Sequence, residues 1–191
     1  MQVWTASHID VPERWESLKE CVNSVRKFNL PHYISISFEP GLSFNIIEIT
    51  DKNLNVLIQP TKISQMEHIR ILDTHVPHSD YIMFMDDDDV LDSLPEVRTQ
   101  IGHQYHTSKL NYFGEMNTLY EPYDAQMDCF DFSGTICTRA YLEEFWEALD
   151  RYPVKRTGDL LLMAMLDKKY LHEKPYVFRR FWNPTRYKHA Y

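Results

Sequence analysis

Five consecutive apolar residues, Tyr81–Met85, are followed directly by four aspartates, Asp86–Asp89. A run of five residues is too short for a helix, and unbroken hydrophobicity is typical of a strand that is buried on both faces. Strands of this kind belong to parallel sheets that are covered by helices on each side. The sequence therefore predicts an α/β fold in which an internal strand ends in a cluster of negative charge.

The residues before this strand alternate between strand and helix patterns. Pro12 fits the first turn of a helix, and Ser64 and Glu67 match a capping box that opens another. Apolar residues recur at helical spacing in both helices, at Trp15, Leu18, Val22 and Val25 and at Ile63, Met66, Ile69, Leu72 and Val76. Short strands are expected at Gln2–Ala6, His32–Phe38, Phe44–Thr50 and Val56–Ile58. This alternation predicts a mostly parallel central sheet flanked by helices.

The second half of the chain is less regular. We expect a helix near Glu96–Tyr105, and we interpret His103 and His106 as surface residues of it. A mixed stretch follows, and the remaining predicted elements are helices at Ala140–Leu149 and Asp159–Leu166 and a strand near Tyr176–Phe181. The 191 residues fit a single domain with a first half (1–91) and a second half (92–191) of different texture.

Composition excludes several classes of function. The net charge is −8, from 20 basic and 28 acidic residues, which argues against a nucleic-acid-binding surface. Three cysteines without a CxxC pair favour a reducing compartment, so we expect a cytoplasmic location. The N-terminus has no signal-peptide pattern, and no stretch approaches 18 apolar residues, so no membrane span is expected.

The four aspartates indicate a ligand site. Open α/β sheets bind ligands outside the carboxyl ends of their strands, where this run is expected to lie. Hard cations such as Mg²⁺ and Mn²⁺ bind carboxylate oxygens and can hold a phosphate oxygen on their other side. A solvated acidic turn is the alternative in a chain of this charge.

Several segments together carry a family resemblance. They are TASHIDVPERWESLKECVNSV, YIMFMDDDDVL, FSGTICTRAYLEEF and TGDLLLMAML, which cover most of the chain. The sequence resembles the GT-A glycosyltransferases, and family 2 of that class in particular. The resemblance implies a GT-A (nucleotide-diphospho-sugar transferase) fold in which residues 1–91 bind the nucleotide sugar and residues 92–191 face the acceptor. The chain is also similar to glycosyltransferase domains at the N-terminus of chlorella virus multidomain proteins, which implies a viral origin, the host cytoplasm and further domains.

The resemblance implies roles for the aspartates. Asp86 would contact the nucleotide ribose and Asp88 would bind the metal, Mn²⁺ or Mg²⁺, with Asp86 as a second candidate ligand. Because four aspartates are adjacent, Asp87 and Asp89 could share those roles. The metal would neutralise charge on the leaving diphosphate as a Lewis acid. His189 would be a further metal ligand, unless it is an exposed residue of the tail.

The resemblance also places the nucleotide base beside the end of the first strand and the end of the second. Glu39 would accept a hydrogen bond from a uracil N–H. Gln65, His68 and Arg70 on the following helix are the candidates to lie near the nucleotide, and Arg70 fits the family's usual position best. The alternatives are that Ser7 and His8 are ordinary loop residues and that Arg70 is a solvent-facing residue of the helix. The nucleotide side of the expected site comprises Thr5, Ala6, Ser7, Glu39, Gln65, Arg70, Asp86 and Asp87.

Asp159 matches the general base of inverting family members, although the family often has two acidic residues where this chain has Gly158 and Asp159. The alternative is a charge at the N-terminus of a helix. The resemblance implies an enzyme that moves a hexose or deoxyhexose from a UDP-sugar to a sugar hydroxyl of a glycan acceptor, with inversion by single displacement.

Two other functions are open at this point. A metal-dependent nucleotidyltransferase also gathers carboxylates at strand ends, although the sequence has no GxxxxGK[ST] loop. A non-catalytic nucleotide- or carbohydrate-binding module is the second alternative.

Overall fold

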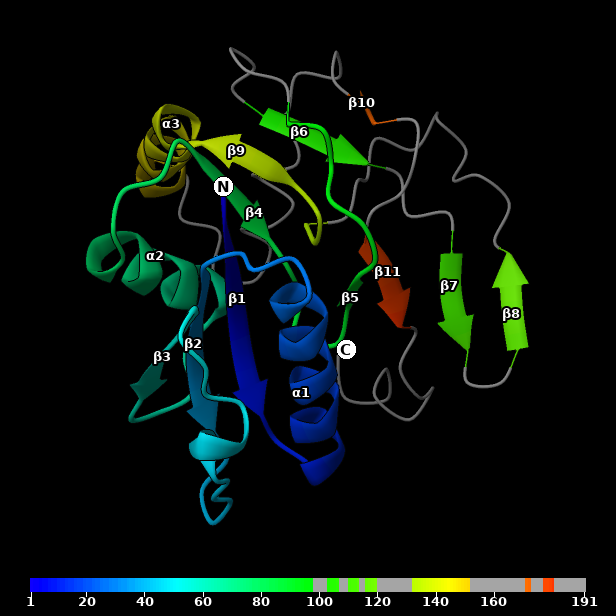
Figure 1. The fold of residues 1–191 in the computed structure, drawn as a ribbon. Coiled ribbons are helices and arrows are strands. Elements are labelled where there is room, and N and C mark those ends of the chain that lie inside the picture. The colour runs from blue at the N-terminus through cyan, green and yellow to red at the C-terminus, as the bar shows by residue number, and fades with distance from the viewer. Residues whose placement is uncertain are drawn as a thin grey trace.

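The computed structural model describes residues 1–97, 103–106, 110–113, 116–119, 132–151, 171–172 and 177–180. Within this part of the chain, helices cover both faces of a central sheet (Figure 1). The helix expected at Asp159–Leu166 lies outside the described residues, as does His189. No helix among the described residues is long and apolar enough to cross a membrane.

The central sheet has seven strands in the order β10-β6-β9-β4-β1-β2-β3 among the described residues. The first four strands of the chain pair in parallel, and β9 lies antiparallel between β4 and β6. The predicted mostly parallel sheet is therefore confirmed. The strands are β1 (Gln2–Ile9), β2 (His32–Phe38), β3 (Leu54–Gln59), β4 (Tyr81–Phe84), β6 (His103–His106), β9 (Ile136–Thr138) and β10 (Leu171–His172).

In the part of the chain that the structure describes, three α-helices connect or follow these strands: α1 (Pro12–Arg26), α2 (Gln65–His75) and α3 (Arg139–Arg151). Pro12 opens α1, as expected. The capping box is confirmed, since the Ser64 Oγ accepts from the Glu67 N–H at 3.2 Å and the Glu67 carboxylate accepts from the Ser64 N–H at 2.7 Å. These caps satisfy first-turn amides and fix where α2 begins.

A smaller sheet lies beside the large one (Figure 1). It contains β5, which follows the aspartates, and β11, which confirms the strand expected near Tyr176–Phe181. The order of its strands is β5-β11-β7-β8. Their bounds are β5 (Val90–Leu91), β7 (Leu110–Phe113), β8 (Met116–Leu119) and β11 (Val177–Arg180).

Two predicted elements are wrong. The strand expected at Phe44–Thr50 is instead a short 3-10 helix, η1 (Ile46–Glu48), because the Asn45 side chain accepts from the Ile47 N–H at 3.2 Å and curls the chain. The helix expected near Glu96–Tyr105 is wrong at both of its described ends, because residues 96–97 have no regular secondary structure and residues 103–105 belong to β6. Pairing with β9 and β10 decides the conformation there, and local pattern does not.

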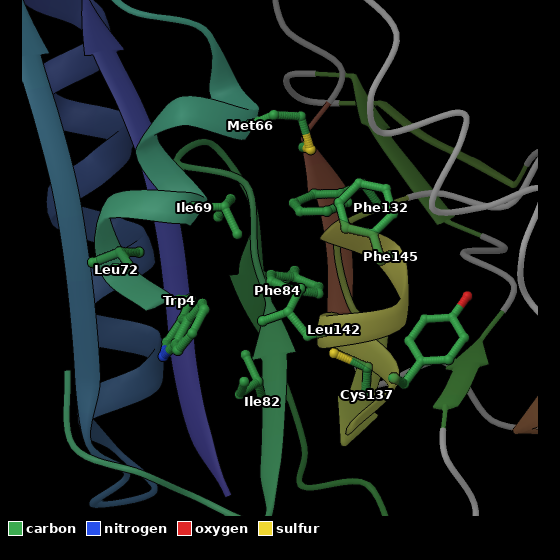
Figure 2. Packing of buried hydrophobic residues seen from close by; sticks show 11 residues of the cluster. Trp4, Met66, Ile69, Leu72, Ile82, Phe84, Phe132, Cys137, Leu142 and Phe145 are labelled. Carbon is green, nitrogen blue, oxygen red and sulfur yellow. The ribbon is translucent and has the colours of Figure 1, made fainter. Parts of the chain in front are cut away.

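The core has a layer on each face of the sheet, because side chains alternate along each strand. Trp4 and Phe84 face α2 and α3, and Figure 2 shows them packed with Phe132 and the apolar residues of both helices. The Phe84 and Phe132 rings stack at 4.6 Å. Val3 and Met83, each one residue earlier, face α1 instead. The apolar run that ends in β4 is thus buried on both faces, as predicted.

The order of the strands creates a switch point. From β1 the chain moves outward through β2 and β3, then returns to place β4 on the other side of β1. This reversal makes the carboxyl ends of β1 and β4 the topological switch point of the sheet, which is where α/β proteins bind ligands. The end of β1 and the aspartates after β4 meet there.

Candidate active site

The four aspartates form a turn immediately after β4, closed by the Asp89 N–H donating to the Asp86 carbonyl at 3.3 Å. Their exposure alternates. Asp87 and Asp89 are buried, whereas Asp86 and Asp88 are partly exposed. This alternation indicates which positions a ligand can reach, because within the turn only Asp86 and Asp88 retain exposed surface.

Asp87 is held inside the protein by two partners. Arg14 on α1 donates from Nε and Nη2 to the two carboxylate oxygens at 2.7 and 3.0 Å, and the Ser7 Oγ donates to Oδ2 at 2.5 Å. Burial alone lowers the pKa of Arg14, but the attraction of Asp87 outweighs it and raises the pKa overall. Arg14 therefore keeps its positive charge, and both oxygens of Asp87 are engaged within the protein.

Helix α1 supports the acidic turn at two more points. The Cys21 thiol donates to the Asp86 carbonyl at 3.5 Å, and the Ser24 Oγ accepts from the Leu91 N–H at 2.9 Å. Burial raises the pKa of Cys21 well above its ordinary value, so the thiol keeps its proton. Contacts on both sides of the turn fix its backbone.

The segment before β9 supports the turn from the other side. The Ser133 Oγ accepts from the Asp86 N–H at 3.0 Å, and the Gly134 N–H donates to the Phe84 carbonyl at 2.7 Å. Gly134 has φ of +86°, a left-handed conformation that favours glycine. The glycine-containing loop expected from FSGTIC thus lies directly beside Asp86.

Two predicted nucleotide-side residues meet at the start of α2. The Gln65 Nε2 donates to the Asp86 Oδ1 at 3.1 Å. The structure does not bring Arg70 to this point, because its guanidinium pairs with Asp150 of α3 at 2.8 Å and lies over the ring of Trp146. Arg70 occupies the exposed helix position that was its alternative interpretation.

The residues expected beside the ends of β1 and β2 differ in how deeply they are buried. Thr5 is fully buried and hydrogen-bonds to His32 at 2.9 Å, so this structure does not place it on the ligand edge. Ser7 is buried against Asp87. Ala6 is partly exposed near the end of β1, and Glu39 follows β2 with half of its side chain exposed. Of these four, Ala6 and Glu39 can still face a ligand.

Sequence analysis did not identify Arg14, and it did not recognise that His8 and His68 belong to one polar chain behind Glu39. A signal for the second existed, since the strand HYISISF places Ser35 and Ser37 on one face of β2. Adjacent serines on a buried face need polar partners. No comparable signal identifies Arg14.

The donor set of the turn fits a hard cation. No group of three or more His, Cys, Asp or Glu side chains within the described ranges is arranged to hold a metal. Mg²⁺ is commonly bound by one or two carboxylates together with substrate phosphates. Asp86 and Asp88 provide two such carboxylates, so the diphosphate of a ligand would complete the coordination. Asp159 and His189, which were predicted to contribute a base and a ligand, lie outside the described residues.

No protein-family profile and no curated protein matches the sequence. Solved structures do match the fold. TarS of S. aureus (residues 1–349), solved in complex with UDP-GlcNAc, superposes with a TM-score of 0.60 at 13% identity, covering 100% of this chain and 62% of that one. The chain has a GT-A fold.

This GT-A fold is shared with enzymes that are named for another reaction. The 2-C-methyl-D-erythritol 4-phosphate cytidylyltransferase of Thermus thermophilus gives a TM-score of 0.51 at 12% identity, covering 97% of this chain and 95% of that one. The 4-diphosphocytidyl-2C-methyl-D-erythritol synthase of Anaerococcus prevotii gives a TM-score of 0.53 at 12% identity, covering 92% of this chain and 90% of that one. This chain therefore spans nearly the whole of both enzymes but about six-tenths of the TarS fragment.

Proposed function

We propose that the chain is a metal-dependent glycosyltransferase that moves a hexose or deoxyhexose from a UDP-sugar to a sugar hydroxyl of a glycan. The observation that carries this proposal is the acidic turn at the switch point, where Asp86 and Asp88 are partly exposed and Asp87 is paired with Arg14. Similarity of fold to TarS, which was solved with UDP-GlcNAc, supports a nucleotide-sugar donor.

In this proposal Asp88, Asp86 and His189 hold Mn²⁺ or Mg²⁺, and Asp86 also contacts the ribose. The cation would supply Lewis-acid stabilisation of the charge that grows on the leaving diphosphate. Gln65 already donates to Asp86 at 3.1 Å and would keep that carboxylate oriented. Glu39 would accept from the nucleotide base.

Asp159 is the proposed general base. The acceptor hydroxyl oxygen would attack the anomeric carbon while Asp159 takes its proton. The bond between that carbon and the diphosphate oxygen breaks, and UDP leaves with the electron pair. A single displacement of this kind inverts the anomeric configuration. Asp159→Asn is expected to retain UDP binding and lose turnover.

Isothermal titration of UDP and a panel of UDP-sugars, with and without Mn²⁺, tests the site. We expect Mn²⁺-dependent binding that Asp88→Asn removes. Asp80→Asn is the matched control, because Asp80 is an exposed carboxylate at the opposite end of the same strand. A folded protein that binds no UDP in either condition would refute the proposal and leave a solvated acidic turn.

A nucleotidyltransferase is the second candidate, because the cytidylyltransferase structures match over nearly their whole length. The released product separates the two reactions. A glycosyltransferase releases UDP from a UDP-sugar, whereas a nucleotidyltransferase releases pyrophosphate from a nucleoside triphosphate. The loop after β1, residues 10–11, contains no glycine, which gives a triphosphate no close backbone approach there.

A non-catalytic binding module is the third possibility. Wild-type turnover by Asp159→Asn, or no turnover on any donor, would favour it.

We further propose a cytoplasmic location, which would be the host cytoplasm if the chain is viral. The similarity to glycosyltransferase domains of chlorella viruses stays a prediction.

A further inference from the structure

A continuous chain of hydrogen bonds runs from the edge strand β3 to Glu39 at the carboxyl end of β2. Its links measure 3.1, 2.8, 3.2, 2.9 and 3.2 Å. Most of it is inaccessible to water, because both serines are fully buried, His68 is 2% exposed and the His8 side chain is 11% exposed. We call it the histidine–serine chain, and its members in order are Gln59, Ser35, His68, Ser37, His8 and Glu39.

The direction of this chain follows from its last member. An ionised carboxylate can only accept, so the His8 Nε2 must carry the hydrogen that reaches Glu39. For a neutral His8 ring the other nitrogen is then an acceptor, and the Ser37 hydroxyl would donate to the His8 Nδ1. Ser37 has now used its only hydrogen. Its other neighbour, the His68 Nε2, must therefore donate to it.

The inner half of the chain agrees with this direction. With its hydrogen on Nε2, neutral His68 accepts from Ser35 through Nδ1. Burial, and then the neighbouring His8, lower the pKa of His68 to about 4, so the ring is neutral near pH 7. The Gln59 amide donates to Ser35, and the same nitrogen also faces the Leu57 carbonyl, which can only accept. Every hydrogen therefore points toward Glu39.

We propose that the histidine–serine chain makes His8 a positioning residue, which holds Glu39 as an acceptor and thereby selects nucleobases with a ring N–H, such as uracil, over cytosine. This inference rests on the proposed function, since it assumes that a nucleotide base reaches Glu39. His8 engages one carboxylate oxygen, Oε2, and the other oxygen is then the acceptor offered to the base. Cytosine presents a lone pair at the equivalent ring nitrogen, so it would leave the contact repulsive.

Glu39→Gln gives the proposal its sharpest test. The His8 N–H would hold the amide oxygen of Gln, so the amide nitrogen would face the base and donate to the cytosine ring nitrogen. The preference for UDP over CDP should then reverse. Without His8 the amide can rotate freely, so the reversed preference should be lost. Glu39 is half-exposed, so this substitution spares the buried core.

The first experiment reads the hydrogen positions without any ligand. Nitrogen NMR of histidine-labelled protein distinguishes the two imidazole tautomers, and the signals are assigned by their disappearance in His8→Phe and His68→Phe. We expect the Nε2–H tautomer for both His8 and His68. Detection of the Nδ1–H tautomer at either residue would overturn the proposed direction of the chain.

The second experiment measures Kd for UDP and CDP with Mn²⁺ present. We expect wild-type protein to favour UDP by at least about tenfold, the effect of one mismatched polar contact. Glu39→Gln should favour CDP, and adding Ser37→Ala or His8→Phe should reduce that preference by about threefold or more. His75→Phe, at an exposed site on the same helix as His68, is the control and should leave both Kd values unchanged.

The outcomes are separable. Equal Kd values for UDP and CDP in the wild-type protein would overturn the selecting role, even if both tautomers are as expected. So would a preference of Glu39→Gln for CDP that stays the same when His8→Phe is added. A folded protein that binds neither nucleotide would refute the proposed function, and base selection with it, while the NMR result would still decide the direction of the chain.

Discussion

Arg14 and Asp87 lie 73 residues apart in the sequence and are joined by two parallel hydrogen bonds of 2.7 and 3.0 Å. The pair connects α1 to the acidic turn after β4. Because Arg14 neutralises one of four neighbouring carboxylates, it lowers the electrostatic repulsion within the turn. Both oxygens of Asp87 are thus engaged inside the fold, and we propose the aspartates on either side of it as the ligand-facing positions.

Arg14→Met should lower the free energy of unfolding by about 2–4 kcal/mol, because it leaves the Asp87 carboxylate buried without its counter-ion. Chemical denaturation monitored by circular dichroism measures this. Arg70→Met is the matched control, since Arg70 and its partner Asp150 are both largely exposed, and it should cost at most about 1 kcal/mol. Equal losses in the two variants would show that the Arg14 pair contributes no more than a surface ion pair.

Substitutions at neighbouring positions of the acidic turn should affect UDP binding and protein stability separately. Asp86→Asn should weaken Mn²⁺-dependent UDP binding by at least about tenfold, because a neutral amide is a poor ligand for a hard cation, and should change the melting temperature little. Asp87→Asn should lower the melting temperature by several degrees, because it removes a charge-assisted pair. Calorimetric titration and thermal denaturation of both variants measure the two effects. The assignment is wrong if the Asp87 variant loses UDP binding while keeping its stability.

Two buried histidines should make stability fall in mild acid. Burial lowers the pKa of His32 to about 3 and, with a contribution from His8, that of His68 to about 4. The unfolded chain binds these protons near pH 6.5 and the folded chain does not, so the free energy of unfolding rises with pH in this window. Between about pH 6 and pH 4 each group should cost about 1.4 kcal/mol per pH unit.

Denaturation midpoints measured across that range check the effect. His32→Phe should flatten the slope by about half, and His75→Phe, at an exposed position, should leave it unchanged. An identical slope in wild type and His32→Phe would show that His32 does not remain neutral in the folded state.

Ser64→Ala should destabilise the protein by about 1 kcal/mol, because it removes the oxygen that caps the first turn of α2. Ser64→Asp keeps an acceptor at this position and should restore most of the loss. Because Gln65 follows the cap and donates to Asp86, the Ala variant should also bind UDP more weakly. Loss of stability without weaker binding would separate the cap from the site.

Much of the first half of the fold could be predicted from the sequence. His32–Phe38 forms a strand with the expected bounds, and the capping box opens α2 where predicted, because these elements combine strong local propensity with a clear apolar period. The strand predicted at Phe44–Thr50 is wrong because its apolar residues have no partner strand among the described residues and because Asn45 offers the backbone a local hydrogen bond. The helix predicted to include residues 103–105 is wrong there because long-range strand pairing overrides the local sequence pattern.

The site was predictable only where a residue's role depends on position along its own strand. Asp86 follows from the end of β4. The burial of Asp87 depends on Arg14, which approaches from α1, and no local pattern encodes that approach. The same holds for Arg70, whose helix position fits the nucleotide side but whose partner Asp150 comes from α3.

The insertion of β9 between β4 and β6 has a consequence for folding on the ribosome. Phe84 at the end of β4 completes its packing only against Phe132 and the apolar face of α3, and the Asp86 amide binds Ser133. While only the first ninety or so residues have emerged during synthesis, β4 lacks its β9 neighbour and the acidic turn lacks one of its two supports. A ligand-competent site can therefore assemble only after α3 has left the exit tunnel, so a premature stop before α3 should yield a chain that chaperones retain.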